Sequence, residues 1–166
     1  MSDQVRLVAH RLAASLRRRG ETVALSETSS GGLASAALLA VPGASAFFVG
    51  AAVLYSRQAR SALAGITEAE LDGIRPETEP YAGLLADRIR AQLGATWGLG
   101  ESGAAGPGHS PYGDKPGHVC ISVSGFRNIS RTIETGATAR DLNMESFAFA
   151  LLSLLEEAIE SVEARQ

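Results

Sequence analysis

The spacing of hydrophobic positions predicts that helices and strands alternate in the first third of the chain. Apolar residues over 5–16 recur every three or four positions, which is typical of an amphipathic helix, and Gly20 would end it. Residues 22–26 form a short β-type run, and the small apolar segment 33–40 predicts a buried helix. Segment 46–55 is continuously apolar, so we expect a strand that is covered on both faces.

The middle of the chain predicts two further helices and a third strand. Ser56 precedes a short helix over 57–64, and 67–70 has the Thr-x-x-Glu spacing of a capping box. Thr78 can cap a helix that carries its apolar face to Gly94. A strand follows over 96–101. Four glycines and three prolines then fall within 102–116, so we expect a long irregular loop there.

A hairpin and a long helix complete the pattern. Alternating apolar residues over 119–123 and 129–135 flank a Gly-Phe-Arg-Asn turn, and an amphipathic helix covers 142–162. We therefore expect one α/β domain over 1–166, a three-layer α/β/α sandwich with a mixed β-sheet.

Composition narrows the class of protein. The 166 residues are 45% hydrophobic but only 5% aromatic, which predicts a core of Ala, Leu, Val and Ile. The net charge is −3 and the longest basic block is Arg17–Arg19, which argues against nucleic acid as a partner. A single cysteine, Cys120, excludes an intrachain disulfide and fits a reducing compartment. Because neither a leader nor a membrane-length apolar run is found, we expect a cytoplasmic protein that has no membrane partner.

A turn between the first strand and the second helix carries the strongest candidate chemistry. Such a turn leaves backbone N–H groups unpaired, and the helix dipole adds positive potential, so it favours an anion. Its hydroxyls are donors or nucleophiles, and its glycines let a ligand approach the backbone. An ordinary helix cap explains the same residue types. The candidate ligand-contacting residues are Glu27, Thr28, Ser29, Ser30, Gly31 and Gly32.

The long loop is expected at the same edge of the sheet, because ligands gather beyond the carboxyl ends of strands. It holds a second glycine-rich stretch, although without the ending of a P-loop. His109 and His118 flank this loop, and either a ligand contact or a solvated position fits them. His10 is expected at the surface, and Cys120 and Trp97 in the core. With no paired histidines or cysteines we expect neither a metal nor a cofactor. The candidate residues of the loop are Gly103, Ala105, Gly106, Pro107 and His109.

Five segments in order resemble one known family. The chain is similar to the CinA C-terminal domain family, the nicotinamide-nucleotide amidases, over nearly its whole length. The matching segments are the turn at 27–32, Val-Pro-Gly-Ala-Ser at 41–45, Tyr-Ser-Arg-Gln-Ala-Arg at 55–60, Thr-Glu-Pro at 78–80, and Gly-Ala-Ala-Gly-Pro at 103–107 with Lys-Pro-Gly at 115–117.

The resemblance implies hydrolysis of the carboxamide of nicotinamide mononucleotide to nicotinate mononucleotide and ammonia, without a metal. Thr28 stands where the family has a nucleophilic serine, Arg60 where it has the base lysine, and Tyr55 at an assisting tyrosine. A desolvated lysine can act as a base, but arginine stays protonated and is better suited to binding a phosphate.

The base is therefore open among His109, His118, Glu27 and Tyr55. The resemblance also implies a homodimer and a divergent branch found as a stand-alone domain. The chain departs from the family at 109–114, where it lacks a glycine-rich run, and at 136–141, before the last helix. Two alternatives to an amidohydrolase remain: a catalytically inactive nucleotide-binding homologue, and a structural homologue that acts through protein contacts.

Overall fold

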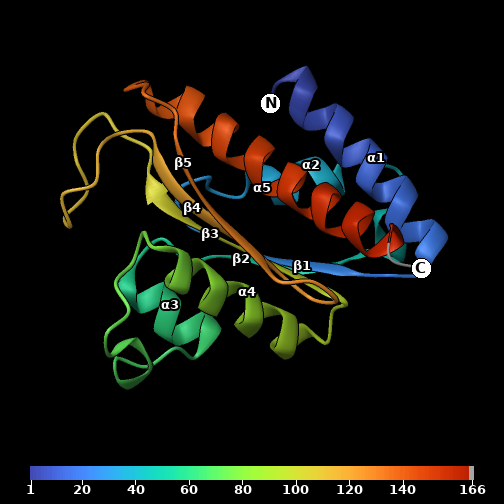
Figure 1. The fold of residues 1–166 in the computed structure, drawn as a ribbon, viewed down its shortest axis with the longest axis horizontal. Coiled ribbons are helices and arrows are strands. Elements are labelled where there is room, and N and C mark those ends of the chain that lie inside the picture. The colour runs from blue at the N-terminus through green and yellow to red at the C-terminus, as the bar shows by residue number, and fades with distance from the viewer. Residues whose placement is uncertain (165–166) are drawn as a thin grey trace.

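The computed structural model describes residues 1–164 and confirms the three-layer α/β/α fold with a mixed sheet. Five strands lie in the order β2-β1-β3-β4-β5; β1 is parallel to β2 and β3, whereas β4 is antiparallel to β3 and β5. Figure 1 shows α1, α2 and α5 on one face of the sheet and α3 and α4 on the other. The elements are α1 (Asp3–Arg19), β1 (Val23–Glu27), α2 (Leu33–Leu39), η1 (Ala44–Ala46), β2 (Phe48–Val53), α3 (Arg57–Ala64), η2 (Ala69–Leu71), α4 (Glu79–Leu93), β3 (Trp97–Ala104), β4 (His118–Ser124), β5 (Ile129–Glu134) and α5 (Arg140–Glu163).

The larger core lies between the sheet and the α1, α2 and α5 layer. Aliphatic side chains dominate it, as the composition predicts, and Trp97 and Cys120 are also buried. The Trp97 indole N–H donates to the Glu21 carboxylate at 2.8 Å, so its one polar atom is satisfied. His10 is exposed, as expected.

On the opposite face, α4 packs against β3 at unusually close range. A Cβ atom at Gly98 would overlap the carbonyl of Ala86, and one at Gly100 would overlap the carbonyl of Ala82. Glycine at these two strand positions therefore lets the backbone of α4 approach the sheet. This contact fixes the start of α4, and with it the preceding segment, relative to the end of β3.

Three expectations are wrong in detail. The segment over 46–55 forms the edge strand β2, and Val49 and Val53 are exposed, because alternate side chains of this strand lie on a face that the rest of the chain leaves uncovered at the edge of the sheet. The irregular loop begins at 105 rather than 102, since 101–104 pair with 118–121 and extend β3. The Thr78 hydroxyl does not cap α4 but donates to the carbonyl of Arg75 at 2.7 Å.

The expected helix ends and the capping box are confirmed. Gly20, Gly65 and Gly94 end α1, α3 and α4 in the left-handed conformation. At the capping box, the backbone N–H of Thr67 donates to the Glu70 carboxylate at 2.9 Å. Within residues 1–164, none of the helices combines the length and apolarity needed to cross a bilayer.

Candidate functional site

A cavity of about 400 Å³ opens at the carboxyl ends of β1 and β3, where the sequence predicts a site. Segments far apart in the chain build its wall: the turn after β1, the connection from β2 into α3, the segment before α4 and the loop after β3. Three arginines and three tyrosines are among the lining residues. The functional groups that line it are Thr28, Ser29, Tyr55, Ser56, Arg57, Arg60, Glu77, Tyr81, Ser102, His109, Ser110, Tyr112 and Arg140.

The turn after β1 is organised around a buried carboxylate that the sequence analysis did not single out. Glu101 on β3 accepts the backbone N–H groups of Thr28 and Ser30, both at 2.9 Å, and that of Ser29 at 3.3 Å. The hydroxyls of Ser29 and Ser30 also contact it. Burial raises the pKa of Glu101, and the hydrogen bonds from the hydroxyls of Ser29 and Ser30 and from the backbone of Ser30 and Thr28 oppose that effect.

Glu27 accepts the backbone N–H groups at the end of the turn and at the start of α2. Its carboxylate accepts the backbone N–H groups of Gly32, Ala34 and Ser35 at 3.0, 3.2 and 2.9 Å. The Ser30 hydroxyl lies 2.7 Å from both Glu27 and Glu101. The N–H groups offered to a ligand's anion in the sequence analysis are therefore bound to two of the protein's own carboxylates. Of the six turn residues, Thr28 and Ser29 line the cavity.

Thr28 and Arg60, the two positions to which the resemblance draws attention, both line the cavity. Thr28 is half-buried, and its backbone is held by Glu101 while its hydroxyl makes no hydrogen bond among the described residues. The Arg60 side chain on α3 is buried, and its Nη2 lies 2.5 Å from the Glu68 carboxylate. Its Nε is buried and has no partner within residues 1–164. Arg60 is thus a fixed cation at the wall.

A second cationic side chain lines the cavity beside Tyr55. Arg140, the first residue of α5, donates to the carbonyl of Gly106 at 2.8 Å and lies 3.4 Å from the Tyr55 hydroxyl. Tyr55 is 68% exposed. Arg57 on α3 also lines the cavity. Arginines suit a phosphate or carboxylate, because their planar donors match its oxygens.

The end of β3 and the loop after it supply backbone and one imidazole to the wall. Gly103, Ala105, Gly106 and His109 line the cavity, whereas Pro107 does not. The Asn143 amide on α5 holds this stretch by donating to the carbonyl of Ala105 at 2.9 Å. His109 is exposed.

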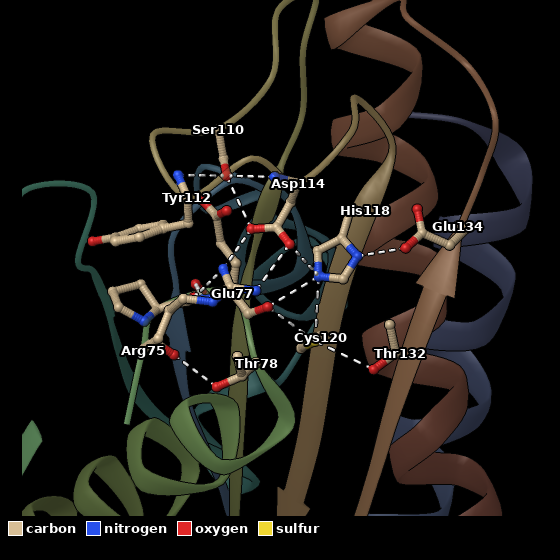
Figure 2. Close-up of polar contacts among 12 residues, drawn as sticks. Arg75, Glu77, Thr78, Ser110, Tyr112, Asp114, His118, Cys120, Thr132 and Glu134 are labelled. Atoms are coloured by element: carbon tan, nitrogen blue, oxygen red, sulfur yellow. Dashed lines mark hydrogen bonds and ion pairs between the residues drawn. The ribbon is translucent and has the colours of Figure 1, made fainter. Parts of the chain in front are cut away.

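A cluster of ionisable side chains joins the segment before α4 to the end of this loop (Figure 2). Arg75 binds Asp114 with two contacts of 2.5 and 3.0 Å and holds the pKa of that carboxyl far below its usual range. Burial raises the pKa of Glu77 to about 6, and the neighbouring Asp114 adds to this. Burial opposes protonation of His118, but Glu134 and the carbonyl of Glu77 outweigh it and raise its pKa.

The candidate bases of the sequence analysis thus occupy different environments. Glu27 is enclosed by N–H donors, and His118 faces Glu134 and lies outside the lining of the cavity. His109 and Tyr55 do reach the wall. Within 1–164, groups of three or more His, Cys, Asp or Glu arranged to hold a metal ion are not found.

Four charged residues of the site were missed from sequence: Glu101, Arg57, Arg140 and Glu77. A signal existed for Glu101, because it is the one charged residue in a predicted strand of small and apolar residues. Arg57 and Arg140 lie inside segments that were compared with the family, but only their neighbours were considered. Nothing in the sequence distinguishes Glu77 from the other surface glutamates.

Comparison with known proteins identifies the family of this chain. The model of the CinA C-terminal domain matches residues 6–159. A CinA-like protein of Anaeromyxobacter sp. (strain K) is 37% identical over 155 residues, which is 92% of this chain and 36% of that protein. One of Prochlorococcus marinus (strain MIT 9313) is 41% identical over 110 residues, 66% of this chain and 26% of that protein. The chain thus spans about a quarter to a third of the length of these relatives.

Solved structures agree on the fold. The crystal structure of a competence-damaged protein (CinA) superfamily protein from Klebsiella pneumoniae 700603 has a TM-score of 0.88 at 20% identity, covering 95% of this chain and 98% of that one. A competence or damage-inducible protein from Enterobacter asburiae has a TM-score of 0.84 at 24% identity, covering 95% and 99%. From the match over 6–159 and these relatives, the chain belongs to the CinA C-terminal domain family.

Proposed function

We propose that this chain is an amidohydrolase that acts on the carboxamide of nicotinamide mononucleotide or of a related small anionic amide. Thr28 would be the nucleophile, and the products would be the free carboxylate and ammonia. One observation carries the proposal: a threonine whose hydroxyl is unengaged among the described residues, on a backbone fixed by Glu101, faces a cavity lined by three arginines.

The arginines are suited to the substrate's phosphate. Arg57, Arg60 and Arg140 line one cavity, and a phosphate bound there would lie beside the hydroxyl of Tyr55. The backbone N–H groups of the turn already donate to Glu27 and Glu101. The arginines would therefore bind the phosphate in place of these N–H groups. Arg60 binds and orients in this scheme, since arginine cannot accept a proton.

A second candidate is a nucleotide-binding homologue that has lost hydrolysis. The ion pair between Arg60 and Glu68 favours it, because the position of the family's base is held by a permanently charged group. Such a protein would use the same cavity and the same arginines, and would leave the amide of its ligand intact.

One experiment separates the two candidates. The purified chain is incubated with nicotinamide mononucleotide, ammonia is measured by a coupled glutamate dehydrogenase assay, and thermal unfolding is recorded with and without the nucleotide. Ammonia release that is lost in Thr28→Ala supports the amidohydrolase. A raised melting temperature without ammonia supports the binding protein, because a ligand of the native state stabilises it. If the nucleotide gives neither ammonia nor a raised melting temperature, both candidates are contradicted.

A further inference from the structure

We propose that Glu77 is the general base of this cavity: its carboxylate accepts the proton of the Thr28 hydroxyl, the role that Arg60 cannot fill. The inference rests on the proposed function only in taking Thr28 as the nucleophile. It assigns a residue that lies in the segment before α4 and outside the glycine-rich turns.

The backbone of Glu77 is held in an unfavourable conformation. Its φ angle is +63°, and it is the one non-glycine residue with positive φ among residues 1–164. Its N–H donates to the Ser102 hydroxyl at 3.2 Å, and its carbonyl lies 3.0 Å from His118 Nε2 and 3.5 Å from the Cys120 thiol (Figure 2). Such strain persists where the surroundings impose it, and it concentrates at functional sites.

One carboxylate oxygen of Glu77 has no partner of its own. Glu77 is among the residues that line the cavity, and its Oε2 is buried without a hydrogen-bond partner in the described part of the chain, while Ser110 and Asp114 are the polar side chains next to the same carboxylate. A buried, unpaired carboxylate oxygen costs free energy unless a ligand or a proton satisfies it. The charged groups that face it are Asp114, Arg75 and His118, and Arg75 already neutralises Asp114.

These neighbours suit Glu77 to proton transfer. Burial, helped by Asp114, raises its pKa to about 6, while Ser110 and His118 act in the opposite direction. The group is therefore mostly ionised at neutral pH, and its conjugate acid is strong enough to return the proton. Asp114 has its pKa lowered by Arg75, which makes it a weaker base, and the Glu27 carboxylate is occupied by backbone N–H donors.

Thr28 and Glu77 are held at two neighbouring residues near the end of β3. The parallel pairing of β1 with β3 runs as far as Ser26 and Gly100, and Thr28 directly follows β1 at this end of the sheet. The backbone N–H of Thr28 bonds to the Glu101 side chain and that of Glu77 bonds to the Ser102 side chain, and these two side chains leave the strand on opposite faces. Both side chains line the one cavity at this strand end.

The step balances within the cavity. The Thr28 hydroxyl oxygen bonds to the amide carbon while its proton passes to Glu77. Glu77 then gives that proton to the amine as the carbon–nitrogen bond breaks and ammonia leaves. Water attacks the acyl-threonine ester, gives a proton to Glu77, and Glu77 returns it to the Thr28 oxygen.

The test uses a small activated ester, so that it does not depend on the identity of the natural substrate. The full chain is mixed with p-nitrophenyl acetate, release of p-nitrophenolate is followed between pH 5 and 8, and the acetylated residue is identified by peptide mass spectrometry. The variants are Thr28→Ala, Glu77→Gln and Glu77→Gly. The matched control is Glu79→Gln, because Glu79 is two residues away, bonds to Thr132 and lies outside the cavity lining.

We expect acetylation of Thr28 at a rate that rises with pH through about 6 and falls about 100-fold or more in both Glu77 variants. Glu79→Gln should react as the unchanged chain does. Glu77→Gly should also melt about 2 °C higher, because glycine relieves the strain of the positive φ. Lost reactivity in a more stable protein is a result that a purely structural role for Glu77 would not give.

Two results would overturn the assignment: acetylation of Thr28 in Glu77→Gln as fast as in the unchanged chain, or an unchanged chain in which Thr28 stays unmodified. The ammonia assay tests the proposed function independently of the role of Glu77. Glu77-dependent acetylation without ammonia from nicotinamide mononucleotide leaves Glu77 as the base and removes the proposed substrate. Ammonia release that persists in Glu77→Gln keeps the proposed function and removes Glu77.

Discussion

The carboxyl group of Glu101 accepts the backbone N–H of Thr28 at 2.9 Å, so a buried side chain from β3 fixes the backbone of the candidate nucleophile. The two residues are 73 positions apart in the sequence. A rigid backbone keeps the Thr28 hydroxyl in place at the cavity wall, and the same carboxylate occupies the donors that would otherwise attract a ligand's phosphate. The turn therefore positions the Thr28 hydroxyl, and we expect the arginines of the cavity to bind an anion.

Replacing Glu101 by methionine should strongly destabilise the fold. The change keeps the volume similar but leaves the N–H groups of Thr28, Ser29 and Ser30 buried without an acceptor. We expect a loss of roughly 3 kcal/mol in the free energy of unfolding, measured in urea. The control is Glu156→Gln, which removes the exposed pair with Arg11 and should cost less than about 1 kcal/mol. Equal losses in the two variants would contradict the role of Glu101.

Replacing Gly100 by alanine tests the close packing of α4 on β3. The new Cβ would overlap the carbonyl of Ala82 and crowd the N–H of Ala86, and both are backbone atoms that cannot move aside. We expect a loss of about 3 kcal/mol or more by urea unfolding. Gly108→Ala is the matched control, because no atom lies within 4 Å of its added Cβ. A Gly100→Ala variant as stable as Gly108→Ala would mean that α4 lies further from the sheet.

The elements of this fold could be predicted because they depend on local pattern. Alternation over 119–123 predicted β4, and Gly20 and Gly94 predicted the ends of two helices. The end of β3 could not be predicted, since 102–104 are strand only through pairing with β4.

The candidate site also has a part that could be predicted from sequence and a part that could not. The hydroxyls and glycines of the turn were visible as a motif, and Thr28 and Arg60 were placed by the family resemblance. The acceptors of the turn's N–H groups include Glu101, which is distant in sequence. Glu77 owes its strained backbone to Ser102 and His118, and its raised pKa to burial and Asp114. Both depend on tertiary contacts that no local pattern records.

The stability of the protein should fall as the pH rises from about 4.5 to about 6, owing to Glu77. Its pKa is raised on folding, so in this range the unfolded chain has lost the proton while the folded one keeps it. Ionisation therefore favours unfolding until both states are ionised above pH 6. Because the group is only half-buried, solvent screening reduces the effect to about 1 kcal/mol.

Urea unfolding at pH 4.5 and 6.5 measures this difference. It should disappear in Glu77→Gln and persist in Glu79→Gln. A difference that is the same in all three proteins would assign the effect to other carboxyl groups.

Restoring the family's two residues should raise amidase activity. In Thr28→Ser with Arg60→Lys, serine removes the methyl group that crowds the attacking oxygen. Lysine at a buried position can lose its proton, because burial lowers its pKa, and can then act as a base. Glu68, which pairs with Arg60, opposes this by favouring the charged form, so Glu68→Gln is added as a third change. We expect ammonia release from nicotinamide mononucleotide to rise about tenfold or more over the unchanged chain.

The control carries Thr28→Ser with Glu68→Gln and keeps Arg60, so that it differs from the triple variant only at the position of the restored lysine. If the folded triple variant releases no more ammonia than this control, then the cavity itself, and not only the pair of residues, has diverged from the family's substrate.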